Sequence, residues 1–534
     1  MARGAGIRCN GTSLGAVLAT TAALLSISAP VVALTPPGPR VNVLVREVNP
    51  ASTVAERLVT QFGGRVGAEL PIVGGFAANV PYRAIVALSG LHGVISEVVP
   101  DSAVSFAGSY GEGSGVASAV YPSVVGADQL WNAGYAGGHV GVAVIDTGIN
   151  NTGDLAGKVV HSEDFSGEGD NVDHFGHGTF IGGLIAGSGA ASGGAVKGVA
   201  PDVNLIALKI AGRDGSADIT HVMAALQWAV SFKEVFNIRV VNLSLGTDST
   251  QDYRIDPLNR AVEEAWKAGI VVVVSAGNNG PNAGTINKPA DDPFVITVGA
   301  VRDNTTPSIS DDIVPSFSGT GPTAANGLPK PDIAAPGGSV ISSRAVGSSV
   351  DSAYPSARIG SSYFKGSGTS FASAITSASA ALILNRTPSL TPDQVKARIV
   401  DTASTGSVTD HNKVGAGWLN AYAATMSNST AAANQGLTWS SGRGSLQLSR
   451  GTHGGENIQT GANGGSLGQT IPAFTGVSGQ LTGENTTFDP ALYFNGNWTT
   501  SSWYTSSWYT SSWYTSSWYT SSWYTSSWYA SDWT

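Results

Sequence analysis

Cysteine is almost missing from this chain: its 534 residues include one, Cys9. Because Cys9 lies in an apolar N-terminal stretch, the rest of the chain holds no thiol for a disulfide, a cysteine–zinc site or a nucleophile. A large domain can be stable on its core alone, so the lack of disulfides does not argue against export. The chain is too long for one ordinary domain, and we expect two or more folded units.

Charge is also scarce, at 12% of the residues, and the balance is acidic, with a formal net charge of −9. Binding to nucleic acid phosphates needs a dense basic surface, so this composition argues against nucleic acid as a partner. After the N-terminal stretch no apolar run reaches the length of a membrane span. The 69 glycines indicate a scaffold with many turns and loops.

Residues 1–33 have the pattern of a signal peptide. Two arginines precede an apolar run over 14–27, and the small residues at 31–33 suit a signal peptidase. An uncleaved membrane anchor is the alternative, but Pro30 follows the apolar run closely and prevents it from extending to the length of an anchor. We therefore expect a secreted, extracellular protein.

Residues 41–101 show the pattern of a small α/β unit. We expect a strand over 41–48, a helix over 53–62, and further strands around 72–80 and 94–99. A Gly/Ser-rich linker over 102–120 follows, and its composition is typical of a segment open to proteolysis. The residues do not single out the bond that is cut.

Residues 121–425 alternate short Val/Ile-rich runs with helical patterns. We expect strands over 140–145, 205–210, 240–245, 270–275 and 295–301, and helices over 180–186, 219–236 and 257–268. This alternation predicts an α/β fold with a mostly parallel central sheet covered by helices on both faces. Reacting groups gather at the carboxyl ends of the strands in such sheets. Asp146 closes the first expected strand, and Asn278 follows the fourth.

Three glycine-flanked segments carry the candidate catalytic groups. They are Val144-Ile145-Asp146-Thr147-Gly148, Gly176-His177-Gly178-Thr179 and Gly368-Thr369-Ser370-Phe371-Ala372. A serine becomes a nucleophile when a histidine takes its proton, and a carboxylate can orient that histidine. His174 lacks the glycine frame, so we favour His177 as the base. Each segment alone has a structural explanation, such as a serine that caps a helix, but the order Asp, His, Ser is that of the subtilisin triad.

Ser370 precedes a long run of alanine, serine and apolar residues, which predicts a buried helix with Ser370 in its first turn. The unpaired N–H groups and the positive dipole at that position would stabilise a developing oxyanion. The amide of Asn278 is the candidate side-chain donor to the same oxygen. Asn279 is the rival donor, but the Ala-Gly-Asn frame favours Asn278.

Together these segments resemble the subtilisin-like serine proteases (subtilases), over about 121–425. The segments Asn242-Leu243-Ser244-Leu245-Gly246, Phe317-Ser318-Gly319 and Lys330-Pro331-Asp332-Ile333-Ala334-Ala335-Pro336-Gly337 are also similar to family motifs. The resemblance implies a serine endopeptidase that acts on protein or peptide substrates through an acyl-enzyme. It places Ser244, Leu245, Gly246, Ala276, Gly277 and Asn278 along the substrate cleft.

The resemblance also implies that 41–101 is an inhibitor- and chaperone-type propeptide, so that the enzyme is made as a self-inhibited zymogen with its own propeptide as a partner. An unrelated small domain is the alternative. A non-catalytic relative that binds peptides is a second alternative for the whole chain.

The chain departs from the family pattern at three positions beside the catalytic groups. Phe371 and Ala374 stand where the family usually has Met and Pro, and Phe180 stands where His is common. No catalytic group is lost, so the departures bear on substrate preference. The chemistry requires no cofactor. Structural calcium is left open, because Asp154 stands where the family often has a ligand but the loop 188–197 offers few side-chain oxygens.

Beyond the peptidase region, residues 426–497 are rich in Gly, Ser, Thr and Asn, and both a small β module and an irregular linker fit them. Residues 498–534 repeat Ser-Ser-Trp-Tyr-Thr, a period that matches neither a helix nor a strand. Two interpretations stay open for this tail. Its aromatic rings retain the protein at a cell surface or polymer, or the tail is a disordered or removed extension.

Overall fold

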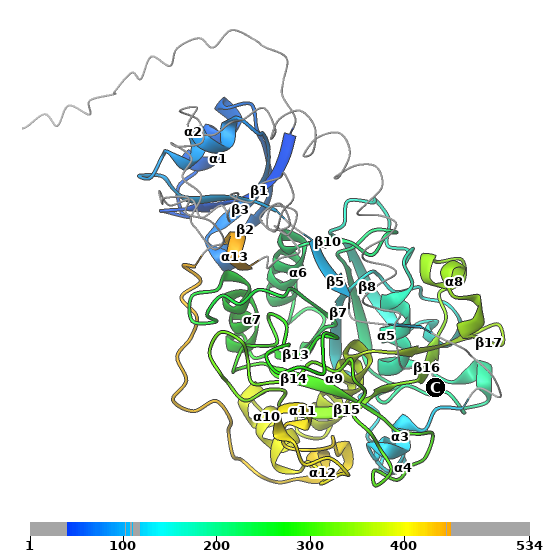
Figure 1. Ribbon diagram of the computed structural model, residues 1–534. Helices are drawn as coiled ribbons and strands as arrows, with labels where there is room; N and C mark the ends of the chain where they lie inside the picture. The colour runs from blue at the N-terminus through cyan, green and yellow to red at the C-terminus, as the bar shows by residue number, and fades with distance from the viewer. Residues whose placement is uncertain (1–39, 102, 107–108, 111–117, 445, 450–534) are drawn as a thin grey trace, which may run out of the picture. The chain divides into compact units, whose positions relative to one another are not determined.

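The computed structural model describes residues 40–101, 103–106, 109–110, 118–444 and 446–449 (Figure 1). The predicted signal peptide at 1–33 and the aromatic tail at 498–534 lie outside these residues, as does most of the region 426–497. Among the described helices, none has the length and apolar character needed to cross a membrane.

The N-terminal part, residues 40–101, is a four-stranded antiparallel sheet with two helices. Its strand order is β2 (Arg65–Leu70), β3 (Gly75–Pro81), β1 (Arg40–Glu47) and β4 (Ile95–Pro100), and its helices are α1 (Val54–Gln61) and α2 (Ala84–Ser89). The strand expected over 41–48 and the helix expected over 53–62 are β1 and α1. Strand β2 was not predicted, because all but its last residue are exposed and the apolar alternation of a half-buried strand is missing.

A seven-stranded parallel sheet forms the centre of the second part. In order across the sheet it consists of β15 (Ile333–Gly338), β14 (Ile296–Arg302), β13 (Val271–Ser275), β11 (Ile238–Leu243), β7 (Gly141–Asp146), β9 (Asn204–Lys209) and β8 (Val159–Asp164). The five central strands are those that the apolar runs predicted. The two edge strands were not predicted, because neither has a long apolar run: β8 is only partly buried, and β15 contains Pro-Gly-Gly.

Helices cover both faces of this sheet, which confirms the predicted fold class (Figure 1). On one face α5 (His177–Ala186) packs against α9 (Thr369–Arg386), and on the other α6 (Ile219–Ser231) packs against α7 (Pro257–Lys267). Every residue of α5 is buried, and α9 is buried from Thr369 to Leu384. The small Ala and Ser side chains of α9 let it lie close to the sheet.

Short elements complete the described chain. The strands are β5 (Ala103–Phe106), β6 (Ser109–Tyr110), β10 (Ala217–Asp218), β12 (Leu245–Gly246), β16 (Val340–Ser343), β17 (Arg358–Ile359) and β18 (Tyr363–Ser367). The helices are α3 (Tyr121–Val124), α4 (Ala127–Asn132), α8 (Ser349–Ala353), α10 (Pro392–Asp401), α11 (His411–Val414), α12 (Ala421–Met426) and α13 (Leu446–Ser449). The 3-10 turns are η1 (Pro71–Val73), η2 (Gly153–Leu155), η3 (Ala190–Ser192) and η4 (Pro355–Ala357).

Candidate active site

Asp146 and His177 are in direct contact at the carboxyl end of the central sheet. Asp146 is the last residue of β7, and His177 is the first residue of α5. The imidazole Nδ1 lies 2.8 Å from Asp146 Oδ1 and 3.0 Å from Oδ2, and both side chains are buried. Gly178 allows this approach, because a Cβ there would lie 2.0 Å from the Gly148 carbonyl oxygen. The arrangement fixes the imidazole with Nδ1 toward the carboxylate.

A second buried carboxylate, Asp173, holds the loop between these two residues. Its Oδ1 accepts hydrogen bonds from the Thr147 hydroxyl and the Gly176 N–H, and its Oδ2 accepts one from the Thr179 N–H. Burial raises the pKa of Asp173, and these hydrogen bonds oppose the rise. Sequence reasoning did not single out Asp173, although an aspartate just before a helix start is a capping signal.

Ser370 is the second residue of α9, as the sequence predicted for its first turn. Its Oγ donates to the Ser244 carbonyl at 3.1 Å, and the Ser244 hydroxyl donates to the Ser370 carbonyl at 3.0 Å. The next residue, Phe371, packs against the His177 ring with the centroids 5.8 Å apart. The packing of α5 on α9 therefore places His177 against the residue that follows Ser370.

Two departures from the family pattern contact each other. Phe180, one turn after His177, lies against Phe371 with a centroid separation of 4.4 Å. Both rings are buried. The two aromatic side chains thus pack together between α5 and α9. Single-residue reasoning could not reveal this pairing, because the two positions are far apart in the sequence.

The carboxamide of Asn278 is oriented by the residue that precedes Ser370. Its Oδ1 accepts from the Thr369 N–H at 3.0 Å and from the Thr369 hydroxyl at 2.8 Å. Because these hydrogen bonds fix the carboxamide oxygen toward Thr369, the Nδ2 group is on the opposite side of the carboxamide, available to donate to another acceptor. Asn279 Nδ2 donates instead to Asn287 Oδ1 at 3.2 Å. Gly277 has φ +99°, and a Cβ there would meet the Asn287 side chain at 2.6 Å, so the Ala-Gly-Asn turn requires glycine.

The predicted substrate-binding residues form an edge that is paired with the chain's own N-terminal segment. Leu245 and Gly246 form β12, which pairs antiparallel with β5, and the other side of β5 pairs antiparallel with β10. Strand β6 pairs antiparallel with Gly366 and Ser367 of β18, directly before the Ser370 segment. Ala276 and Gly277 lie beside Gly319, where a Cβ would meet the Ala276 carbonyl oxygen at 2.6 Å.

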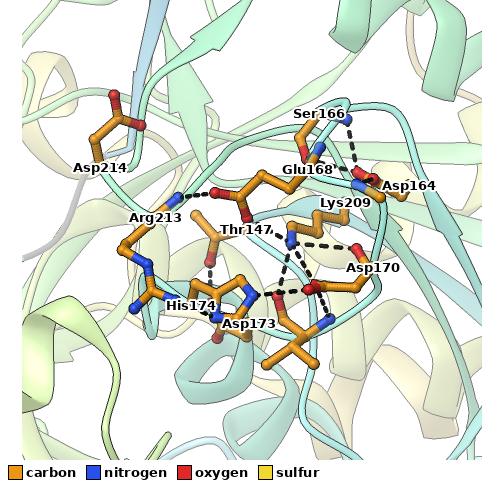
Figure 2. Close-up of polar contacts among 12 residues, drawn as sticks. Thr147, Asp164, Ser166, Glu168, Asp170, Asp173, His174, Lys209, Arg213 and Asp214 are labelled. Carbon is orange, nitrogen blue, oxygen red and sulfur yellow. Dashed lines mark hydrogen bonds and ion pairs between the residues drawn. The ribbon is translucent and has the colours of Figure 1, made fainter.

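Beside the His177 loop lies a network of charged groups (Figure 2). Arg213 Nη2 lies 3.0 Å from His174 Nδ1, and His174 Nε2 lies 3.0 Å from Asp170 Oδ2. His174 is therefore engaged away from Asp146, in keeping with the preference for His177 as the base.

Glu168, Asp170 and His174 are grouped closely enough to suggest a metal site, but the side-chain ammonium of Lys209 contacts both carboxylates. Lys209 Nζ lies 2.8 Å from Glu168 Oε2 and 3.2 Å from Asp170 Oδ1 (Figure 2). Burial opposes the charge of Lys209, but the two carboxylates outweigh burial and raise its pKa. The ammonium supplies the positive charge that a metal ion would supply.

The chain was compared with known proteins. The family model described as "Subtilase family" matches residues 137–422. The serine protease AprX of Bacillus subtilis (strain 168) is 44% identical over 288 residues, which cover 53% of this chain and 65% of AprX. Subtilisin DY of Bacillus licheniformis is 36% identical over 56% of this chain and 96% of its own. Subtilisin Savinase of Lederbergia lenta is 35% identical over 57% of this chain and 97% of its own.

Proposed function

Because the chain belongs to the subtilase family of serine proteases, we propose that it is a serine endopeptidase that hydrolyses peptide bonds through an acyl-enzyme. The observation that carries the proposal is the buried contact of His177 Nδ1 with Asp146 at 2.8 Å, beside Ser370 at the start of α9. Ser370 is the nucleophile, His177 the base, Asp146 the group that orients the base, and Asn278 the oxyanion donor.

Each group has a defined step in this mechanism. When a substrate carbonyl enters, Ser370 Oγ leaves the Ser244 carbonyl and attacks, and His177 Nε2 takes its proton. Asp146 accepts a hydrogen bond from the Nδ1–H and stabilises the imidazolium. The negative oxygen of the tetrahedral intermediate is held by Asn278 Nδ2 and the N–H groups at the first turn of α9. His177 then protonates the leaving amine, and water releases the acyl group by the reverse sequence.

The test compares casein hydrolysis by the wild type, Ser370→Ala and Ser379→Ala. Ser379 lies in the same helix, and its hydroxyl donates to the Ile375 carbonyl within that helix. We expect Ser370→Ala to lose several orders of magnitude in activity and Ser379→Ala to keep it. Equal activity in the wild type and Ser370→Ala would mean that the chain is a peptide-binding relative without triad chemistry.

The N-terminal part is proposed to be a propeptide that inhibits the enzyme by lying in its substrate cleft. An extended segment held between two strand edges is how peptides are commonly bound by β-strand addition, and β5 lies so between β10 and β12. Further contacts support this docking. The Ile72 N–H donates to Gln227 of α6 at 3.0 Å, and the Thr220 hydroxyl donates to Asp101.

The same strand pairings suggest where the zymogen is cut. Strand β5 ends at Phe106 and β6 begins at Ser109. Strand β5 pairs with β12, next to the Ser244 carbonyl that accepts from Ser370 Oγ, and β6 pairs with the end of β18, just before the Ser370 segment. We therefore expect the maturation cut within the bonds that join Phe106 to Ser109. Mass spectrometry of the active enzyme should find its N-terminus at residue 107, 108 or 109, and purified Ser370→Ala should remain uncut. A mature N-terminus outside this window would refute the assignment.

Export and surface retention are the remaining parts of the proposal. The signal pattern at 1–33 supports secretion, and its cleavage would appear in the same mass spectra. Retention by the aromatic tail is tested by binding of the full chain and of a chain truncated at Asn497 to cell-wall material. Stronger retention of the full chain would support the tail as an anchor, whereas equal retention would exclude it.

A further inference from the structure

Asp154 lies in the turn η2, shortly after Asp146, and its buried carboxylate accepts hydrogen bonds from protein groups on both oxygens. Oδ1 accepts from the Ala191 N–H at 2.9 Å and from the Ser188 hydroxyl at 3.4 Å. Oδ2 accepts from the Tyr363 hydroxyl at 2.6 Å. The three donors come from the loop 188–197 and from β18, so the carboxylate joins three separate segments of the chain.

This donor set does not fit calcium, which takes 6–8 oxygen ligands with carboxylates prominent among them. The loop 188–197 has no carboxylate. Three of its carbonyl oxygens are directed at protein donors: that of Gly189 accepts from Ser192, that of Ala190 from Gly193, and that of Lys197 from the Tyr121 hydroxyl. Protein hydrogen atoms therefore point at these carbonyl oxygens and at both carboxylate oxygens of Asp154.

We propose that the Tyr363 hydroxyl does at Asp154 what a bound cation would do: it joins the loop 188–197 and η2 to β18 without a metal. Strand β18 begins at Tyr363 and leads directly into the Gly368-Thr369-Ser370 segment. It also carries Gly366 and Ser367, which pair with β6. Tyr363 is thus a positioning residue for the nucleophile and for the edge of the cleft on the leaving-group side.

Burial makes this hydrogen bond costly to lose. Tyr363 is 4% exposed and Asp154 is 5% exposed. The Tyr363 ring packs with Val196 of the loop and Ile359 of β17 in a small apolar cluster. Replacing the hydroxyl by hydrogen keeps this packing but removes the donor to Asp154 Oδ2. Leaving a buried acceptor without its donor is destabilising.

The first experiment measures thermal unfolding of the full chain in a Ser370→Ala background, which prevents self-digestion. Tyr363→Phe should lower Tm by roughly 3–8 °C. The Tm of the parent should be the same in EGTA and in millimolar CaCl2, and calcium should not restore Tyr363→Phe. Tyr121→Phe is the matched control, because its hydroxyl donates to the Lys197 carbonyl of the same loop whereas that of Tyr363 donates to Asp154.

The second experiment is kinetic and rests on the proposed peptidase activity. With Ser370 present, Tyr363→Phe should lower kcat/KM more for peptides that extend beyond the cleaved bond than for a short anilide, because β18 pairs with the former. Tyr121→Phe should leave this ratio unchanged. The stability measurement needs no activity, so failure of the peptidase assignment and failure of this inference are distinguishable.

Three results would overturn the inference. A parent Tm that falls in EGTA or rises with CaCl2 would contradict a structure that is held together without a bound cation. An unchanged Tm in Tyr363→Phe would show that the hydroxyl does not hold the loop to β18. An equal kinetic loss for both substrate types would remove the positioning role on the leaving-group side.

Discussion

Asn278 is the residue whose role can be isolated most cleanly, because its orientation depends on few contacts. Replacing it by alanine removes the Nδ2 donor, together with the acceptor of the two Thr369 hydrogen bonds, and keeps the side chains of Asp146, His177 and Ser370. We expect kcat to fall about 10²–10³-fold with little change in KM, the size known for the corresponding donor of subtilisin. Steady-state kinetics on a peptide substrate measure both constants.

Asn279→Ala is the matched control for this prediction. Asn279 is adjacent, but its amide donates to Asn287, so the variant should retain kcat within a few-fold. If Asn279→Ala lowered kcat more than Asn278→Ala, the proposed assignment of Asn278 as the oxyanion donor would be wrong.

At the scale of single residues the sequence singled out the proposed reacting groups but not the residues that support them. Asp146, His177 and Ser370 sit in glycine frames that permit close backbone approach, and that signal is local. Asp173 gave no comparable signal, because an aspartate in a loop near a helix start is common and its contact with Thr147 forms only in the fold. The contact of Phe180 with Phe371 is likewise a product of helix packing.

Among the short elements, α8 supports the histidine loop and depends on one carboxylate. The Ser349 and Val350 N–H groups donate to the carbonyls of His174 and Phe175. Asp351 anchors this helix, because its carboxylate accepts from two arginines, Arg344 at 2.6 Å and Arg358 at 2.7 Å.

The Asp351 anchor predicts an acid-sensitive element. Burial opposes ionisation of Asp351, but hydrogen bonds from Arg344, Gly347 and Arg358 outweigh burial and lower the pKa to about 2. A depressed carboxyl pKa adds stability above the unfolded pKa of about 4, and this stability is lost as pH falls from about 4 to 2. Asp351→Asn should lower Tm by about 3–6 °C at pH 7 and flatten the pH dependence of Tm in that window. An unchanged pH profile would contradict the assignment.

The segment that follows the peptidase region, 427–444, is attached mainly by side chains. Trp439 stacks on Phe294 with centroids 3.6 Å apart and an angle of 8°, and Lys267 Nζ lies 4.3 Å from the Trp439 ring. Trp439→Ala should cost about 1–3 kcal/mol of unfolding free energy. Leu437→Ala, at the same 37% exposure, should cost less than half as much. Equal losses in urea unfolding would show that the stacking adds nothing.

Elements were predictable where burial on both faces produced long apolar runs, as in β13 and β14. They were not predictable where tertiary contacts create them. Strands β5, β6, β10 and β12 have two to four residues each and exist through pairing with one another or with β18. The position of 427–444 on the peptidase part could not be predicted either, because its polar, small-residue sequence does not indicate which surface it contacts.

Taken whole, the molecule joins its N-terminal part to the peptidase part through contacts whose partners are far apart in the sequence. No local pattern could predict that Asp101 meets the first turn of α6, where the Thr220 N–H and hydroxyl donate to its carboxylate. A carboxylate is favoured at a helix N-terminus by the unpaired N–H groups and the dipole. Asp101 lies just before β5, so it fixes the point at which the N-terminal part reaches the strands β10 and β12.

In the proposed zymogen, Asp101 would link docking of the N-terminal part to maturation. Asp101→Ala should weaken the hold of the N-terminal part by about 1–2 kcal/mol, or roughly 5–30-fold, and slow the appearance of the cleaved fragment. Once cleavage has occurred, the weaker hold should shorten the lag before full activity. Asp101→Asn keeps an acceptor for Thr220, so its cleavage rate and its lag should lie between those of the wild type and of Asp101→Ala. If cleavage and lag were the same in all three proteins, followed by gel electrophoresis and peptide hydrolysis, this contact would play no part in zymogen docking.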